Sequence, residues 1–176
     1  MCFPGFADLA AARALLPRDA TPLVVVYPGP IDPGSGWPRP HFADVVSRCV
    51  RGGALVALVG PAADAELLND IWRQADQQLS WGAADVVVVL AGIDAPTMCG
   101  LLALGGVVVG GDSQVREQAH GVDTPTVGAA KRSPDEVMDE VSELLGQSRH
   151  DGGGARPSRR DSEVLGGRPD VTGLDL

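Results

Sequence analysis

The sequence has 176 residues, 44% of them hydrophobic, which suffices for one globular domain with a buried core. Its formal net charge is -9 and it has no basic stripe, so neither nucleic acid nor an anionic membrane surface is an expected partner. No apolar run approaches the roughly 20 residues of a membrane span, and no signal-peptide pattern occurs, so we expect a cytoplasmic protein.

The cysteines and histidines are scattered along the chain without a CxxC motif. This spacing predicts neither a zinc site nor a disulfide framework. The residues concerned are Cys2, Cys49, Cys99, His41, His120 and His150.

The first predicted element is a short amphipathic helix over residues 6–16, which ends before Pro17. Phe6, Leu9 and Leu16 recur at helical intervals and form its apolar face. A helix this short is marginal alone, so we expect that face to dock on the following body.

From residue 22 onward, apolar β-branched runs alternate with segments of helical periodicity. This alternation predicts an α/β fold: a Rossmann-like parallel sheet of about five strands with helices on both faces. The predicted strands cover residues 23–27, 54–60, 84–92, 107–109 and 125–129, and the predicted helices cover 41–51, 62–78, 95–104, 113–121 and a segment that begins after Ser133.

The ends of two helices carry clear signals. Asp94 precedes the helix at 95–104, and Ser133 with Pro134 and Glu136 forms a capping box before the last helix. Residues 148–176 are rich in Gly, Arg, Asp and Ser, which predicts a disordered tail. The chain is thus expected to consist of a lead-in at 1–20, a domain at 21–147 and this tail.

The most informative stretch follows the strand at 107–109, where Gly110 and Gly111 precede Asp112 and Ser113 at a helix start. Glycines let the backbone approach a ligand, and a helix N-terminus attracts anions such as phosphate. The stretch therefore predicts a phosphorylated or nucleotide-like ligand. Asp112 or Ser113 acting only as a helix cap is the structural alternative.

Ligands of parallel sheets bind at the carboxyl ends of the strands, near the switch in strand order. A nicotinamide cofactor is disfavoured because no GxGxxG follows the first strand. Four loops are predicted to converge at that edge: residues 28–37, 60–64, 92–96 and 110–113.

The stretch VVVYPGPIDPGSGWPRPHFADVV resembles the opening of the C-terminal domain in heptosyltransferase-like glycosyltransferases, glycosyltransferase family nine. There a strand ends in Pro-Gly, and a later Trp-Pro precedes an aromatic residue and a helix. The matching positions here are Pro28, Gly29, Trp37, Pro38 and Phe42.

The stretch VVVGGDSQVREQAHGVDTPTV resembles the donor-site element of the same family, although Gln114 replaces its glycine and Glu117 its histidine. Gly60 likewise matches the end of the family's second strand. The positions in register with the donor-site element are Asp112, Ser113, Ala119, Pro125, Thr126 and Val127.

The resemblance implies one half of a GT-B glycosyltransferase that binds a nucleotide-diphosphate sugar without a metal or other cofactor. No Lys or Arg lies between Tyr27 and Trp37, which leaves Arg39, Arg116 and Arg132 as the nearest cations for a diphosphate. No catalytic residue is assigned. The substrate-binding residues that the resemblance implies are Gly29, Ser35, Trp37, Gly60, Gly110, Gly111, Asp112, Ser113 and Glu117.

In this family the acceptor site and the carboxylate base belong to an N-terminal domain, and residues 1–20 resemble the helix between the domains. We therefore expect activity only with a separate N-terminal domain or as part of a longer parent sequence. The expected protein partner is that separate acceptor domain or a second copy of the chain in a homo-oligomer. One alternative is a degenerate domain kept for binding or interaction without turnover. Another is a relative of the sugar-nucleotide epimerases, which share the GT-B architecture.

Overall fold

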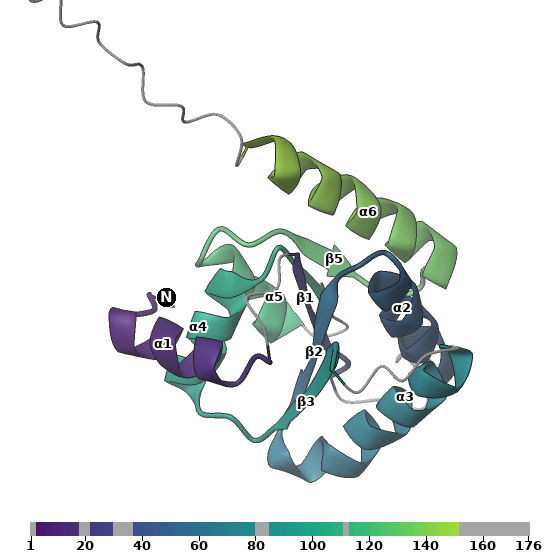
Figure 1. Ribbon diagram of the computed structural model, residues 1–176, viewed down its shortest axis with the longest axis horizontal. Helices are drawn as coiled ribbons and strands as arrows, with labels where there is room; N and C mark the ends of the chain where they lie inside the picture. The colour runs from purple at the N-terminus through teal and green to yellow at the C-terminus, as the bar shows by residue number, and fades with distance from the viewer. Residues whose placement is uncertain (1–2, 18–21, 30–36, 80–84, 111–112, 152–176) are drawn as a thin grey trace, which may run out of the picture.

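The structure, a computed structural model, describes residues 3–17, 22–29, 37–79, 85–110 and 113–151. Strands and helices alternate along the chain, which confirms the predicted α/β fold (Figure 1). The elements in chain order are α1 (Phe6–Ala14), β1 (Leu23–Tyr27), α2 (Arg39–Arg51), β2 (Leu55–Gly60), the 3-10 turn η1 (Ala62–Asp64), α3 (Ala65–Gln78), β3 (Val87–Ala91), α4 (Ala95–Leu104), β4 (Val107–Gly110), α5 (Ser113–His120), β5 (Thr126–Gly128) and α6 (Pro134–Asp151).

The described strands form one parallel five-stranded sheet in the order β3-β2-β1-β4-β5. From β1 the chain proceeds to β2 and β3 on one side, returns to place β4 on the other side of β1, and ends the sheet with β5 next to β4. Val24 of β1 therefore has Val56 on one side and Val107 on the other. This doubly wound order places the topological switch between β1 and β4.

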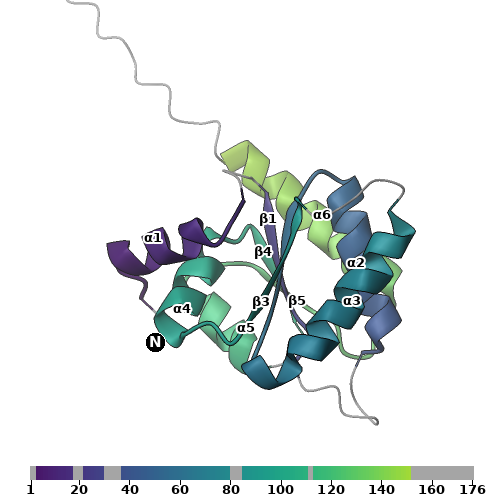
Figure 2. The ribbon, with the colours of Figure 1, turned by 60° about the horizontal axis from the view of Figure 1, so that its bottom comes forward.

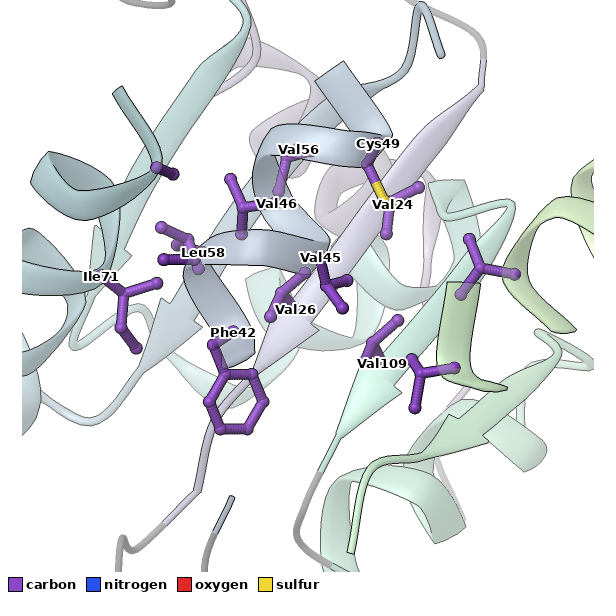
Figure 3. Packing of buried hydrophobic residues seen from close by; sticks show 14 of the residues in the cluster. Val24, Val26, Phe42, Val45, Val46, Cys49, Val56, Leu58, Ile71 and Val109 are labelled. Atoms are coloured by element: carbon purple, nitrogen blue, oxygen red, sulfur yellow. The ribbon is translucent and has the colours of Figure 1, made fainter. Parts of the chain in front are cut away.

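Helices cover both faces of the sheet, as Figures 1 and 2 show. The face under α2, α3 and α6 receives Val24 and Val26 of β1, which pack with Phe42 and Ile71 (Figure 3). The alternate residues Leu23 and Val25 pack toward α4 and α5. A strand covered on both faces is apolar at every position, which explains its unbroken run in the sequence.

The helix α1 docks on α4, as predicted, but only part of the predicted face takes part, since Leu16 packs against the core and Phe6 does not. Phe6 is 89% exposed, whereas Ala12 is fully buried. At the crossing, a Cβ on Gly100 of α4 would lie 2.3 Å from the Asp8 carbonyl oxygen. The two helix backbones approach so closely that small residues form the contact, and a face built around Phe6 cannot.

The predicted caps of α4 and α6 are confirmed. The Thr97 amide donates to Asp94 Oδ1 at 2.8 Å. The Ser133 amide donates to Glu136 Oε2 at 2.7 Å, and the Glu136 amide donates back to Ser133 Oγ at 3.3 Å. These bonds hold the pKa of both carboxyl groups below its ordinary value, because they stabilise the charged form.

Helix α6 continues to Asp151, past the predicted start of a tail at residue 148. The rest of the predicted tail, residues 152–176, lies outside the described residues. The prediction that the cysteines form no disulfide is wrong for Cys99, which is disulfide-bonded. Spacing along the sequence does not reveal which residues the fold brings together. Cys49 is free, and burial raises the pKa of its thiol to about 12.

Candidate functional site

A hollow of about 220 Å³ lies at the carboxyl edge of the sheet, beside the switch between β1 and β4. Its walls come from the ends of two strands, from the segment after β3, and from the first turns of α4 and α5. We call it the carboxyl-edge hollow. Its lining residues are Tyr27, Val59, Gly60, Pro61, Ile93, Ala95, Met98, Gln114, Val115 and Gln118.

The lining of the carboxyl-edge hollow is mixed, with apolar side chains beside three polar ones. Met98 and Val115 belong to the cluster under α4 and α5. Gln114 and Gln118 stand one helical turn apart on α5 and bring two amides to the same wall. With the Tyr27 phenol they supply donors and acceptors but no charge. Such a lining suits the flat face and polar edge of one uncharged ring.

The rim of the hollow is fixed by a close contact between two segments. The Gly92 amide donates to the Gly60 carbonyl at 2.9 Å. Gly92 adopts φ +73°, and a Cβ there would lie 2.9 Å from Ala62 Cβ. Ile93 follows directly and enters the hollow. The segment after β3 is thereby held against the end of β2.

Several predicted site residues lie at this edge. Gly60 lines the hollow. Gly110 ends β4 directly beside Tyr27, and Ser113 begins α5. Gly29 is buried with φ 70°, just beyond the end of β1. Predicted site residues outside the described part of the chain are Ser35, Gly111 and Asp112.

Trp37 lies on the opposite face of the sheet from the hollow. It is 5% exposed and belongs to the cluster under α2, α3 and α6. Its indole Nε1–H donates to the Arg132 carbonyl at 2.7 Å, and its ring meets Phe42 edge to face at 5.0 Å. These contacts favour a role for Trp37 in stabilising the fold over the ligand contact that the resemblance implies. Glu117 is exposed on α5 and does not line the hollow.

Sequence reasoning missed most of the residues that line the hollow. In the sequence, Gln114 stands out only as a departure from the family element, and Gln118 belongs to no motif. The available signal was their i, i+4 spacing at the start of the helix that follows β4. Ile93 lies in the loop 92–96 that was predicted to reach this edge, whereas Met98 is an ordinary apolar helix residue in the sequence and only the fold places it here.

A second hollow, of about 190 Å³, lies at the other edge of the sheet between α2 and α6. Cys49 and Met138 line it, with their sulfur atoms 3.9 Å apart. No group of three or more His, Cys, Asp or Glu suited to a metal occurs in the described ranges. Within the same ranges, no helix has the length and apolarity needed to cross a bilayer.

No protein-family model and no curated protein matches the sequence. Among solved structures, the chain is similar to ADP-heptose LPS heptosyltransferase II of E. coli, with a TM-score of 0.72 at 19% identity over 84% of this chain and 54% of that chain. It is similar to a glycosyltransferase family 9 protein of Veillonella parvula, with a TM-score of 0.65 at 11% identity over 82% of this chain and 53% of that chain.

The chain is also similar to a putative UDP-N-acetylglucosamine 2-epimerase of Listeria monocytogenes, with a TM-score of 0.60 at 14% identity over 79% of this chain and 39% of that chain. It spans about half the length of the two glycosyltransferase structures. The fold is therefore that of one Rossmann-like half of a GT-B glycosyltransferase. The similarity in fold to these two structures agrees with the heptosyltransferase-like fold that the two stretches in the sequence predict.

Proposed function

We propose that this chain is the nucleotide-sugar-binding half of a metal-independent glycosyltransferase of the heptosyltransferase-like type. The observation that supports the proposal best is the carboxyl-edge hollow, which lies where doubly wound sheets bind their ligands. A hollow of about 220 Å³ is smaller than a typical pocket for a whole ligand of this size. It fits one ring of a nucleotide sugar, and the remainder extends along the rim.

In the proposed arrangement the nucleoside enters the hollow. Its ring packs on Met98 and Val115, and its polar edge meets the amides of Gln114 and Gln118. The diphosphate then runs toward the start of α5 at Ser113, where backbone N–H groups and the helix dipole favour an anion. The transferred sugar, a hexose or heptose, lies beyond the diphosphate.

Transfer also needs an acceptor and a general base within hydrogen-bond reach of the attacking hydroxyl. We propose that both come from a second, acceptor-binding domain. The structural relatives, which are about twice as long as the stretch they share with this chain, support this division. Donor binding is therefore the activity to be tested on this chain, and turnover is to be tested with the second domain.

Isothermal titration with ADP-, GDP- and UDP-sugars tests donor binding. Ala95 lines the hollow yet is exposed, so Ala95→Trp fills the hollow without disturbing the core. We expect this variant to bind at least about tenfold more weakly, which corresponds to about 1.4 kcal/mol. Ala14→Trp, at an exposed position of α1, is the matched control and is expected to bind normally. The absence of binding by every nucleotide sugar at millimolar concentration rules the proposal out.

A second candidate is a non-catalytic domain that binds a protein partner. Exposed aromatic side chains near the N-terminus favour it, since Phe3 is 76% and Phe6 89% exposed. Light scattering over a range of concentrations tests self-association, and a strictly monomeric chain counts against this candidate. The similarity to the putative epimerase is one of fold, so an assay for epimerisation at C2 of UDP-N-acetylglucosamine distinguishes that alternative.

A further inference from the structure

Three neighbouring strands end at the same level on the face of the sheet that carries α4 and α5. Tyr27 of β1 pairs in register with Gly110 of β4, and Gly110 pairs with Gly128 of β5. The residue before each of them packs into the cluster under α2, α3 and α6, so these three residues face the other way. They form a row that begins at the carboxyl-edge hollow, which Tyr27 lines, and ends at the edge strand of the sheet.

The backbone does not require a glycine at position 128, because φ there lies outside the left-handed region that favours glycine. Glycine inside a strand has a cost in stability and often marks a place where another group approaches closely. The approaching group here is a side chain of α5. A Cβ on Gly128 would lie 3.2 Å from Arg116 Nη1 and 4.0 Å from Arg116 Cζ. Glycine therefore leaves room for the Arg116 guanidinium over the end of β5.

Helix α5 directs this guanidinium toward the carboxyl edge. The helix begins at Ser113, shortly after the end of β4, and Arg116 lies in its first turn. Helical side chains tilt toward the N-terminus of their helix, and for α5 that is the end at the carboxyl edge. Gln114 and Gln118 of the same helix line the hollow, whereas Arg116 lies on the side of β5. One helix thus presents two amides on one flank and a cation on the other.

The other two arginines considered for a diphosphate lie with the helices on the opposite face. Arg39 Nη1 is 3.0 Å from Asp70 Oδ2, at the junction of α2 and α3. Arg132 pairs with the Glu140 carboxylate of α6. Of the three, Arg116 is the one carried by a helix that also lines the hollow.

The row from Tyr27 to Gly128 spans two strand spacings, about 10 Å. A ribose with two phosphates is long enough to extend over such a distance. A nucleoside in the hollow would therefore place its diphosphate past Gly110 and within reach of Arg116. A guanidinium binds phosphate oxygens through two parallel charge-assisted hydrogen bonds. Such local bonds can offset the net charge of -9, which opposes the approach of an anion.

We propose that Arg116 binds the diphosphate of the ligand, and that Gly128 provides the room in which its guanidinium lies. This inference rests on the proposed function and adds the residue that recognises the phosphates. The hollow takes the uncharged nucleoside, and Arg116, on the other side of α5, supplies the positive charge that the lining of the hollow lacks.

The test separates the contribution of the diphosphate from that of the nucleoside. Isothermal titration of the full chain compares adenosine with ADP, guanosine with GDP and uridine with UDP, at about 20 and about 300 mM NaCl, on either side of a Debye length of roughly 10 Å. For the base that binds, we expect the diphosphate to bind at least about tenfold tighter than its nucleoside at low salt, and less so at high salt. A diphosphate that binds no tighter than its nucleoside overturns the inference.

The decisive variant is Arg116→Gln. We expect it to weaken diphosphate binding about tenfold and to leave the Kd of the nucleoside unchanged. Arg116→Lys keeps the charge but loses the paired donors, so its loss should be intermediate, about threefold. Arg73→Gln removes the same charge at an exposed position of α3 and is the matched control, expected to change neither Kd. Equal effects of Arg116→Gln and Arg73→Gln would show that only the net charge matters and would contradict the inference.

A variant of the strand tests the position of the guanidinium without changing the charge. Gly128→Val fills the space that the Arg116 guanidinium occupies, and Val suits a strand. We expect Gly128→Val to weaken diphosphate binding at least about threefold while the nucleoside Kd stays constant. A folded Gly128→Val protein, as judged by circular dichroism, that binds the diphosphate like the wild type would refute the role assigned to Gly128.

The inference and the proposed function fail in different ways. If nucleotide sugars bind and Arg116→Gln binds them like the wild type, the inference is wrong and the proposed function stands. If no nucleoside, nucleotide or nucleotide sugar binds, both are wrong.

Discussion

Tyr27, the last residue of β1, lies directly beside Gly110, the last residue of β4. The helices that follow these two strands lie on opposite faces of the sheet, α2 on one and α5 on the other (Figure 2). Tyr27 lines the carboxyl-edge hollow beside this switch in strand order. The location of the candidate site follows from the order of the strands.

Trp37 is predicted to stabilise the fold without contributing to ligand binding. Trp37→Phe removes the hydrogen bond to the Arg132 carbonyl and leaves a small void, so we expect a loss of about 2 kcal/mol in the free energy of unfolding. Trp72→Phe, at a half-buried position of α3, is the matched control with an expected loss below about 1 kcal/mol. Urea titrations measure both. If Trp37→Phe weakens nucleotide-sugar binding at unchanged stability, Trp37 contacts the ligand after all.

The close crossing of α1 and α4 predicts opposite effects of alanine at two helical glycines. Gly100→Ala drives a methyl group into the Asp8 carbonyl, and we expect it to destabilise the protein by about 1–3 kcal/mol. Gly146→Ala in α6 has no atom within 4 Å of the new methyl group and is expected to stabilise by about 0.5–1 kcal/mol. Thermal and urea unfolding provide the comparison. Equal effects would show that α1 does not dock as described.

Gly92 is predicted to matter for both the stability and the shape of the hollow. Gly53→Ala meets open space at φ +85°, so it carries only the conformational cost of about 1 kcal/mol. Gly92→Ala carries that cost at φ +73° and also a clash with Ala62, for which we expect a further 1–3 kcal/mol, roughly. Because Ile93 follows Gly92, donor affinity should fall in Gly92→Ala alone. An unaltered affinity of Gly92→Ala for the nucleotide sugar would show that the contact between Gly60 and Gly92 does not shape the ligand site.

The Asp94 cap predicts a specific loss of stability in acid. Its pKa is lowered from 3.8 by the bonds to Thr97, so its contribution is present at neutral pH and is lost as the pH falls through the folded-state pKa, below about 4. Asn caps a helix as well as Asp does but does not titrate. We therefore expect the stability of Asp94→Asn relative to the wild type to rise as the pH falls from about 5 to about 3, because the wild type loses the contribution of its charged cap once the pH drops below the ordinary Asp pKa of 3.8. The urea midpoints of the variant and the wild type at both pH values measure this change. A difference between the two midpoints that does not vary with pH would show that the charged Asp94 carboxylate is not the cap of α4.

Local sequence signals predicted the elements closely. The apolar β-branched runs predicted β1 at residues 23–27 and the helical periodicity predicted α4 at residues 95–104, with the bounds that the structure has. These predictions succeeded because buried parallel strands and capped helices leave their pattern in neighbouring residues. The strand order and the extension of α6 to Asp151 were not predicted, since both depend on packing between distant segments.

The candidate site was only partly accessible from the sequence. The glycine-rich edge was predicted from Gly60 and Gly110, because strand ends and turns are local features. The position of Trp37 was not, since its hydrogen-bond partner Arg132 lies 95 residues further along the chain. The pairing of Gln118 with Met98 in one wall likewise requires two helices to meet, which no local pattern encodes.

The most direct test of the central claim is a map of backbone amide shifts, recorded by NMR while the full chain is titrated with the nucleotide sugar that binds. We predict that the largest shifts occur at Gly60, Ile93, Met98 and Gln118, which line the carboxyl-edge hollow. We also predict that the indole N–H of Trp37, on the other face of the sheet, stays unchanged. Shifts confined to the α2 and α6 side, with none around the hollow, would contradict the account.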